Sequence, residues 1–398
     1  MNQTTIDYIR QHVNDDVRQL ALRGCKDPEV DLPFALEQIA GRQKARTKLP
    51  SWAEKDDIIY PPHFNMEQCS SEPTARYKAQ LAGEGGTFVD LTGGFGVDFF
   101  FMSQGFTRCI YVEQNADLCT IVENNMRVLG RSCSVVCNLS AEYLSTMEHA
   151  DVVYLDPARR NEHGGRTYSI EDCSPNVLEL LPLLMEKAER VILKLSPMLD
   201  WHQAVKALKY VTDVHIVSVD NECKELLLVL SRQRSDALRL VCVNGDTTFE
   251  FIPTVGTTYS HRGNKPFPGW EQSSSQKQVL FLYEPNASIM KAGCFEALED
   301  RFPVQQVDPN SHLFVSVDEI SDFPGRRFQI LTISSMNKRE LKEALIGIDK
   351  ANIAVRNFPM SVADLRQRLK LKEGGEVYIF ATTIANKGHQ LLVCRKKS

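Results

Sequence analysis

The middle of the chain alternates short apolar runs with amphipathic stretches. The apolar runs span four to six residues and have the composition of buried strands. They lie at residues 87–91, 109–112, 134–137, 151–155, 191–195, 215–219 and 225–230. Three of the intervening stretches, residues 97–105, 116–129 and 175–189, have apolar positions at helical spacing. This alternation predicts an α/β fold built on a doubly wound sheet.

The last two predicted strands are separated only by residues 220–224. A segment this short cannot form the helical crossover that joins parallel strands, so the two strands must run antiparallel. We therefore predict a sheet of seven strands with a reversed seventh strand, which departs from a plain dinucleotide-binding sheet.

The two ends of the chain follow other patterns. Apolar residues from Ile6 to Leu20 have helical spacing, and a second helix is predicted to end near Pro50. After residue 235, short strands, turns and Pro/Gly clusters replace the alternation. We predict four regions, namely a helical region at 1–75, the sheet domain at 76–235, connecting strands with a small α+β unit at 236–325, and a second α+β unit at 326–398.

Composition narrows the classes of protein. The 398 residues are 43% hydrophobic and 24% charged, which suits two or three globular domains. No apolar run approaches the ~20 residues of a membrane span, and the start lacks the segments of a signal peptide, so we expect a cytoplasmic protein with no membrane partner. The cysteines form no CxxC pair and the histidines show no ligand spacing, so no metal is predicted.

A glycine-rich turn follows the first predicted strand. Gly93, Gly94 and Gly96 lack a Cβ atom, so the backbone there can approach a ligand closely. The second strand ends on Glu113, and a βαβ crossover would place this carboxylate beside the turn, facing a ribose. The pattern predicts a nucleoside site.

The residues around the turn indicate which nucleoside-containing cofactor binds there. Phe99 occupies the third glycine position of a dinucleotide fingerprint, where it is too large for close helix–strand packing. Asp90 and Asp98 place negative charge around the turn, which repels a phosphate but suits an ammonium and a sulfonium. We therefore predict S-adenosyl-L-methionine as the cofactor, and not NAD.

Two groups of motifs resemble a known family. Residues 90–98 resemble motif I, and residues 152–160 resemble motif IV, of class I S-adenosylmethionine-dependent methyltransferases. Residues 356–359, 365–369 and 371–380 resemble the THUMP-like C-terminal domain of a bacterial family of these enzymes. The resemblance implies a Rossmann-like methyltransferase sheet, followed by a ferredoxin-like unit and a THUMP-like domain.

The resemblance also implies which residues bind the cofactor. These lie in or beside the glycine turn, at the end of the second strand and after the third strand. They are Asp90, Thr92, Gly93, Gly94, Gly96, Asp98, Glu113, Asn138 and Ser140.

Motif IV resembles that of ribosomal-RNA guanine-N2 methyltransferases and implies that Asp156 and Pro157 are catalytic. A carboxylate there would accept the hydrogens of a base amine and stabilise the charge that develops on nitrogen. Ala158 and Arg159 stand where amine-methylating enzymes carry a second proline and an aromatic residue. Arg159 and Arg160 are either surface residues of this loop or contacts to RNA phosphate or guanine.

A uracil-C5 mechanism would need a cysteine after the fifth strand, and the loop at 194–200 contains none. The family resemblance implies that the partner is RNA, either rRNA or tRNA, methylated at a base nitrogen with guanine N2 favoured; no DNA partner is expected. The net charge of −5 confines any RNA surface to a local patch. Its candidate residues are Arg326, Arg327, Arg366, Arg368, Lys370, Lys372 and 395–397. The alternatives are an inactive cofactor-fold protein that binds RNA or protein, and a methyltransferase of a small molecule or protein.

Overall fold

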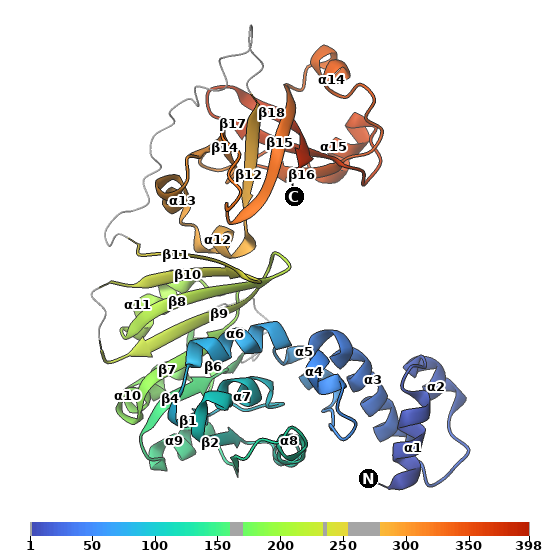
Figure 1. The fold of residues 1–398 in the computed structure, drawn as a ribbon, viewed down its shortest axis with the longest axis vertical. Helices are drawn as coiled ribbons and strands as arrows, with labels where there is room; N and C mark the ends of the chain where they lie inside the picture. Colours follow the sequence, from blue (N-terminus) through green and yellow to red (C-terminus); the bar gives the residue numbers. More distant parts are fainter. Residues whose placement is uncertain (1, 160–169, 234–236, 254–278, 398) are drawn as a thin grey trace. The chain divides into compact units, whose positions relative to one another are not determined.

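The computed structural model describes residues 2–159, 170–233, 237–253 and 279–397. The chain forms two compact units (Figure 1). The first unit comprises residues 1–219 and 224–238, and the second comprises residues 220–223 and 239–398. Across the described ranges, every helix is too short or too polar to span a membrane.

The first unit begins with helices, as predicted. They are α1 (Gln3–His12), α2 (Val17–Arg23), α3 (Leu32–Lys48), α4 (Pro50–Ala53), α5 (His63–Gln68) and α6 (Glu72–Ala82). The apolar spacing from Ile6 to Leu20 falls on two helices, because the side chain of Asp16 caps the first turn of α2. Ile9, Leu20 and Ile39 pack into a small core beneath them.

The sheet of the first unit has the predicted strands. They are β1 (Gly85–Asp90), β2 (Phe106–Glu113), β3 (Ser134–Cys137), β4 (Ala150–Leu155), β7 (Ala188–Leu195), β8 (Val211–Val219) and β9 (Glu222–Ser231). Their order across the sheet is β3-β2-β1-β4-β7-β9-β8. Strand β9 pairs antiparallel with β7, which confirms the reversed seventh strand.

Helices separate the parallel strands of this sheet. They are α7 (Val97–Met102), α8 (Ala116–Val128), α9 (Ser140–Thr146), α10 (Val177–Lys187) and α11 (Trp201–Leu208). Short 3₁₀ turns η1 (Ser103–Gly105) and η2 (Ile170–Asp172) and a ribbon of β5 (Ala158–Arg159) with β6 (Cys173–Ser174) complete the unit. Because β1, β2 and β4 are parallel, their carboxyl ends meet at one edge of the sheet.

The second unit begins with a hairpin, β10 (Arg239–Asn244) and β11 (Thr247–Phe251). Its other strands are β12 (Leu280–Pro285), β13 (Gln305–Gln306), β14 (Phe314–Ser316), β15 (Gly325–Ser334), β16 (Asn352–Arg356), β17 (Val377–Ile384) and β18 (Gly388–Lys396). Its helices are α12 (Ala287–Ala292), α13 (Phe295–Arg301), α14 (Lys338–Ala344) and α15 (Val362–Leu369). The sequence predicts one helix at residues 287–298, but the chain forms two, because Gly293 adopts a left-handed conformation with φ +73°.

One sheet runs through both C-terminal α+β regions. Its order is β13-β14-β12-β15-β18-β17-β16. The junction between the two regions is the antiparallel pair β12–β15, in which Leu282 faces Phe328. Both residues are fully buried in a shared core, so the two regions are packed together rather than separate.

Candidate functional site

The turn between β1 and α7 needs its glycines for two different reasons. A Cβ atom on Gly93 would lie 2.0 Å from the ring of Tyr111, so this glycine makes room for a buried aromatic side chain. Gly94 and Gly96 have φ values of +52° and +80°, which favour glycine. The Tyr111 hydroxyl donates a hydrogen bond of 2.6 Å to the Gly94 carbonyl and fixes the turn against β2.

Glu113 lies beside this turn, as the sequence predicts. Its Oε2 accepts a hydrogen bond of 3.0 Å from the backbone N–H of Gly94, and its Oε1 accepts one of 2.9 Å from Asn115. The carboxylate therefore bridges the glycine turn and the start of α8. Each carboxylate oxygen retains acceptor capacity for a ligand.

Asp90 is buried at the end of β1, with 1% of its surface exposed. The backbone N–H of Thr92 donates to its Oδ1 at 3.0 Å. Burial raises the pKa of Asp90 well above its usual range, and the carboxylates of Asp98, Asp156 and Glu113 raise it further. Asp90 is thus a buried acid that lacks a positive partner among the described residues.

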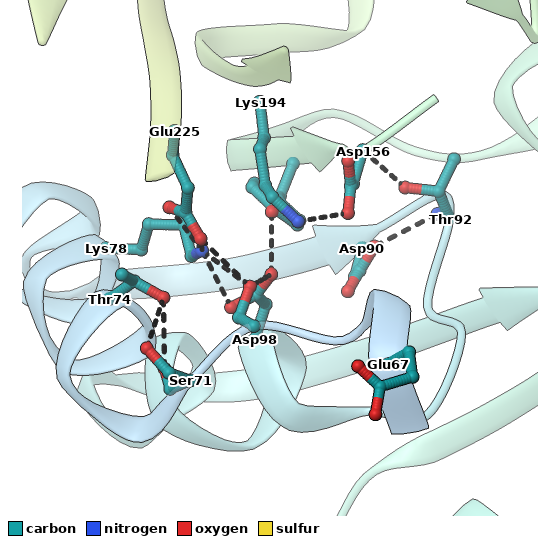
Figure 2. A network of polar contacts seen from close by, with 12 residues as sticks. Glu67, Ser71, Thr74, Lys78, Asp90, Thr92, Asp98, Asp156, Lys194 and Glu225 are labelled. Carbon is teal, nitrogen blue, oxygen red and sulfur yellow. Dashed lines mark hydrogen bonds and ion pairs between the residues drawn. The ribbon is translucent and has the colours of Figure 1, made fainter. Parts of the chain in front are cut away.

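Asp98 belongs to a buried network of charges behind the turn (Figure 2). The ammonium of Lys78, which is fully buried, lies 3.0 Å from Asp98 Oδ1 and 2.6 Å from Glu225 Oε1. Ser70 and Tyr154 donate hydrogen bonds to Asp98 Oδ2, each at 2.8 Å. Burial raises the pKa of Asp98, but the cations of this network outweigh it and the pKa is lowered.

Asp156 forms an ion pair with Lys194. The β4–β7 register pairs Leu155 with Leu193, so the next residue on each strand lies side by side. The Lys194 ammonium is 2.5 Å from Asp156 Oδ2, and the backbone N–H of Asp156 donates to Thr92 Oγ1 at 2.6 Å. The Asp156 side chain is 37% exposed, whereas that of Lys194 is 13% exposed. Within the described residues, Asp156 Oδ1 accepts no hydrogen bond.

Asp156 and Lys194 each shift the pKa of the other. Burial lowers the pKa of Lys194, but Asp156, Glu225 and Asp98 outweigh it and the pKa is raised, so Lys194 is an ammonium at neutral pH. Burial raises the pKa of Asp156, and Lys194 opposes this shift. Lys194, Lys78 and Glu225 were not predicted from the sequence as site residues. The sequence does offer one signal for them, which is a charged residue among apolar neighbours. Lys194 lies in the apolar run 191–195, Glu225 begins the apolar run 225–230, and Lys78 lies in the helix before the first strand.

A cavity of about 1200 Å³ brings most of the predicted residues together. Its lining includes Asp90, Thr92, Gly93, Gly94, Gly96, Asp98, Glu113, Ser140, Asp156, Pro157 and Lys194. Ser140 is held by a hydrogen bond of 2.6 Å to the Leu91 carbonyl. Asn138 does not line the cavity, where Leu139 appears instead. Arg159 lies in β5, and Arg160 lies outside the described residues.

Two family models match the C-terminal regions of the chain. A family model described as THUMP domain-like matches residues 325–396, and one described as a ferredoxin-like domain matches residues 281–324. The comparison with curated proteins found no match. Two solved structures resemble part of the chain, M. capricolum TrmK with S-adenosyl-homocysteine (12% identity, 40% of this chain and 68% of that one, TM-score 0.32) and an rRNA methylase from Streptococcus thermophilus (12%, 40% and 95%, TM-score 0.31).

A further solved structure resembles the whole chain. It is a "putative methyltransferase" from Porphyromonas gingivalis W83, which is 30% identical, with a TM-score of 0.85. The match covers 99% of this chain and 98% of that one. The likeness extends over the helical region, the sheet domain and both C-terminal regions. The chain therefore belongs to the family of class I S-adenosylmethionine-dependent methyltransferases that carry a C-terminal THUMP-like domain.

Proposed function

We propose that this chain methylates RNA, at a nucleophile presented to Asp156. The observation that carries the proposal is the position of this carboxylate. It follows β4, is hydrogen-bonded through its backbone to the glycine turn, and is fixed through Oδ2 by Lys194 while its side chain stays partly exposed in the cavity. The THUMP-like region supports RNA as the substrate class.

The residues of the cavity fit S-adenosyl-L-methionine. A Cβ atom on Gly94 would project into open space, with its nearest neighbour, the Thr92 carbonyl oxygen, 3.8 Å away. The buried acid Asp90 lacks the cation that the cofactor's ammonium or sulfonium provides. Glu113 would accept hydrogen bonds from the ribose hydroxyls. The other predicted contacts that line the cavity are Thr92, Gly93, Gly96, Asp98 and Ser140, whereas the predicted contact Asn138 lies outside its lining.

When bound, the cofactor supplies an electrophilic methyl group. Asp156 orients the nucleophile, because its Oδ2 is held by Lys194 and its Oδ1 is left to accept a hydrogen bond. For a base amine, with guanine N2 favoured by motif IV, the carboxylate would stabilise the positive charge that develops on nitrogen. Pro157 follows on the same segment and would restrict the loop that holds the base.

Lys194 favours a second candidate nucleophile, a ribose hydroxyl. An ammonium in a site of low exposure stabilises negative charge and disfavours positive charge nearby. A hydroxyl that loses its proton to Asp156 develops negative charge on oxygen, which Lys194 can stabilise. An amine develops the opposite charge, so the ion pair would assist it less.

Nucleoside mass spectrometry tests both candidates. Total RNA from cells with and without the gene is digested and compared, and the purified protein is then used to restore the missing nucleoside with an isotopically labelled methyl donor. Fragmentation shows whether the label stays with the base or leaves with the sugar. A base label supports the amine, and a sugar label supports the hydroxyl.

The same experiment separates the rival classes. If no nucleoside differs and no RNA accepts label, the RNA proposal is wrong. Label on protein or on a small metabolite would then support another substrate class. If no fraction carries label but the protein still binds the cofactor, the result would support a binding protein without catalytic activity.

A further inference from the structure

The second unit contains a cavity of about 300 Å³ whose lining is rich in cations and amides. Its polar lining residues are Asn221, Asn244, Thr247, Asn286, Arg326, Arg327, Lys396 and Lys397. No carboxylate lines it among the described residues. The chemistry of the lining therefore suits an anion.

Two strand ends bring the four cations together. Strand β15 starts at Gly325 and β18 ends at Lys396, and the two strands are antiparallel neighbours. The register pairs Phe328 with Lys396, and the backbone N–H of Lys397 donates to the Arg327 carbonyl at 2.9 Å. The dibasic pair at the start of one strand thus lies beside the dibasic pair at the end of the other.

Hydrogen bonds fix the amide side of the cavity. The backbone N–H of Asn221 donates to Asn244 Oδ1 at 2.8 Å, which ties two turns together. The backbone N–H of Ala287 donates to Asn221 Oδ1, also at 2.8 Å. Asn286 is 8% exposed and lies at the start of α12. The side chains of Asn221 and Asn244 are thus held in place before any ligand arrives.

The surrounding acids do not cancel the positive charge. Glu284 is almost fully buried and pairs with both Arg326 and Arg356. Glu319 lies 3.1 Å from Lys397. Among the described residues, these two carboxylates pair with Arg326, Arg356 and Lys397. The described lining itself contains four cations and no carboxylate, so the cavity presents positive charge at neutral pH.

We propose that this cavity binds backbone phosphates of the RNA substrate. The inference rests on the proposed RNA methylation and deepens it by locating a docking site. Arginine and lysine donate charge-assisted hydrogen bonds to phosphate oxygens, and the asparagine amides and the Thr247 hydroxyl add neutral donors. Such contacts position the RNA without reading its bases.

Four of the other predicted basic residues form a separate group in and just after α15, whereas Arg395 lies in β18 outside the cavity lining. Arg366 donates to the Ala351 carbonyl at 3.1 Å and is partly buried, so it is engaged within the protein. Arg368, Lys370 and Lys372 are exposed, and neither they nor Arg366 line the cavity. The structure thus divides one sequence-predicted patch into two groups that can be tested apart.

The test measures binding of a fluorescently labelled RNA hairpin to the full chain by anisotropy over a range of salt concentrations. The cavity variant is Lys396→Gln with Lys397→Gln. The matched control is Lys338→Gln with Lys342→Gln, two exposed lysines of α14, which removes the same charge from the same unit. A third variant, Thr247→Val, removes one donor without changing charge.

The cavity variant should weaken binding roughly tenfold at low salt and reduce the salt slope by about 0.7–0.9 for each phosphate that is no longer neutralised. The control should stay near wild type, and Thr247→Val should weaken binding without changing the slope. Equal loss of affinity in the cavity variant and the control would overturn the site. So would a loss of affinity seen only when Arg368, Lys370 or Lys372 is replaced. Neither result would contradict the proposed RNA methylation. Absence of RNA binding by the wild-type chain would count against both proposals.

Discussion

Lys194 and Asp156 form a contact of 2.5 Å at the carboxyl edge of β4 and β7. Neither residue reaches this position by a local turn; each follows a buried strand segment, and the parallel register sets them side by side. The cation opposes the effect of burial on the Asp156 pKa. The pKa of Asp156, which is partly exposed in the cavity, is therefore tuned by a neighbour on the next strand.

Lys194→Gln should slow methyl transfer and move its pH dependence. Without the cation, the strongest opposition to burial is lost and the pKa of Asp156 rises further. The group needed in its ionised form then gains its charge at higher pH, so the acid limb of the pH–rate profile shifts upward. Single-turnover rates across the pH range measure this shift.

Lys194→Arg is the informative partner of that variant, because it keeps the charge. It should retain the acid limb near its wild-type position even where the rate is lower. Lys206→Gln, at an exposed position on α11, is the control for loss of a lysine. An unchanged acid limb in Lys194→Gln would show that the ion pair does not control the reacting acid.

Glu113→Gln should weaken cofactor binding by roughly 1–3 kcal/mol, because one strong acceptor of the ribose hydroxyls is lost. Glutamine keeps one acceptor oxygen for the N–H groups of Gly94 and Asn115, so it disturbs the turn less than alanine does. Calorimetric titration measures the affinity, and Glu113→Ala should show a larger loss. Wild-type affinity in both variants would remove Glu113 from the cofactor site.

The sequence predicts those features that depend on residues close together in the chain. The five residues between the last two predicted strands indicate a reversed seventh strand, and β9 runs antiparallel to β7 in the structure. The sequence also favours helix starts at Ser71 with Pro73 and at Asn115, and α6 and α8 begin directly after Ser71 and Asn115. The glycine turn and the strand-end acid Glu113 were likewise predicted together, because a βαβ unit fixes their relation.

The sequence was uninformative where the geometry depends on register or on side-chain packing. Lys194 sits within an apolar strand and gives no sign of its partner until the β4–β7 register is known. Gly93 was explained by close approach of a ligand, but the ring of Tyr111 accounts for it. The cations that line the second cavity were not separated from those near α15, because strand ends distant in sequence bring them together.

Asp90→Asn should stabilise the ligand-free protein at neutral pH. Because the pKa of Asp90 is raised in the folded state, the folded chain binds this proton more tightly than the unfolded chain does. Its contribution to stability is therefore fully present below the unfolded pKa, about 3.9, and is lost as the pH rises through the folded pKa. Asparagine is neutral throughout and escapes that loss.

The measurement compares midpoints of thermal unfolding for wild type and Asp90→Asn at acidic and neutral pH. The variant's advantage should appear at neutral pH and shrink as the pH falls. Asp57→Asn, an exposed position, controls for the change in net charge. The same Asp90 variant should bind the cofactor more weakly, since it cannot become the anion that a bound cation favours; tighter or equal binding would contradict this role.

Asp156→Asn tests the centre of the proposed mechanism. The side chain keeps its shape and its backbone hydrogen bond to Thr92. It loses the negative charge that would stabilise an amine or accept a hydroxyl proton, and loss of one such interaction typically lowers the rate about 10²–10³-fold. Cofactor affinity should change little, because Glu113 and the glycine turn are intact.

Single-turnover kinetics on an RNA identified by the nucleoside comparison would show slow chemistry with normal binding of both ligands. The variant also separates the two nucleophiles. A hydroxyl needs a group to take its proton, so its methylation should recover in Asp156→Asn as the pH rises and solvent hydroxide replaces the carboxylate. A base amine attacks as the neutral group, so its slower rate should be nearly independent of pH in the same range. Full activity in Asp156→Asn at every pH would exclude a role for this charge, and a trapped covalent RNA–protein adduct would point instead to the uracil-type chemistry that the loop at 194–200 argues against.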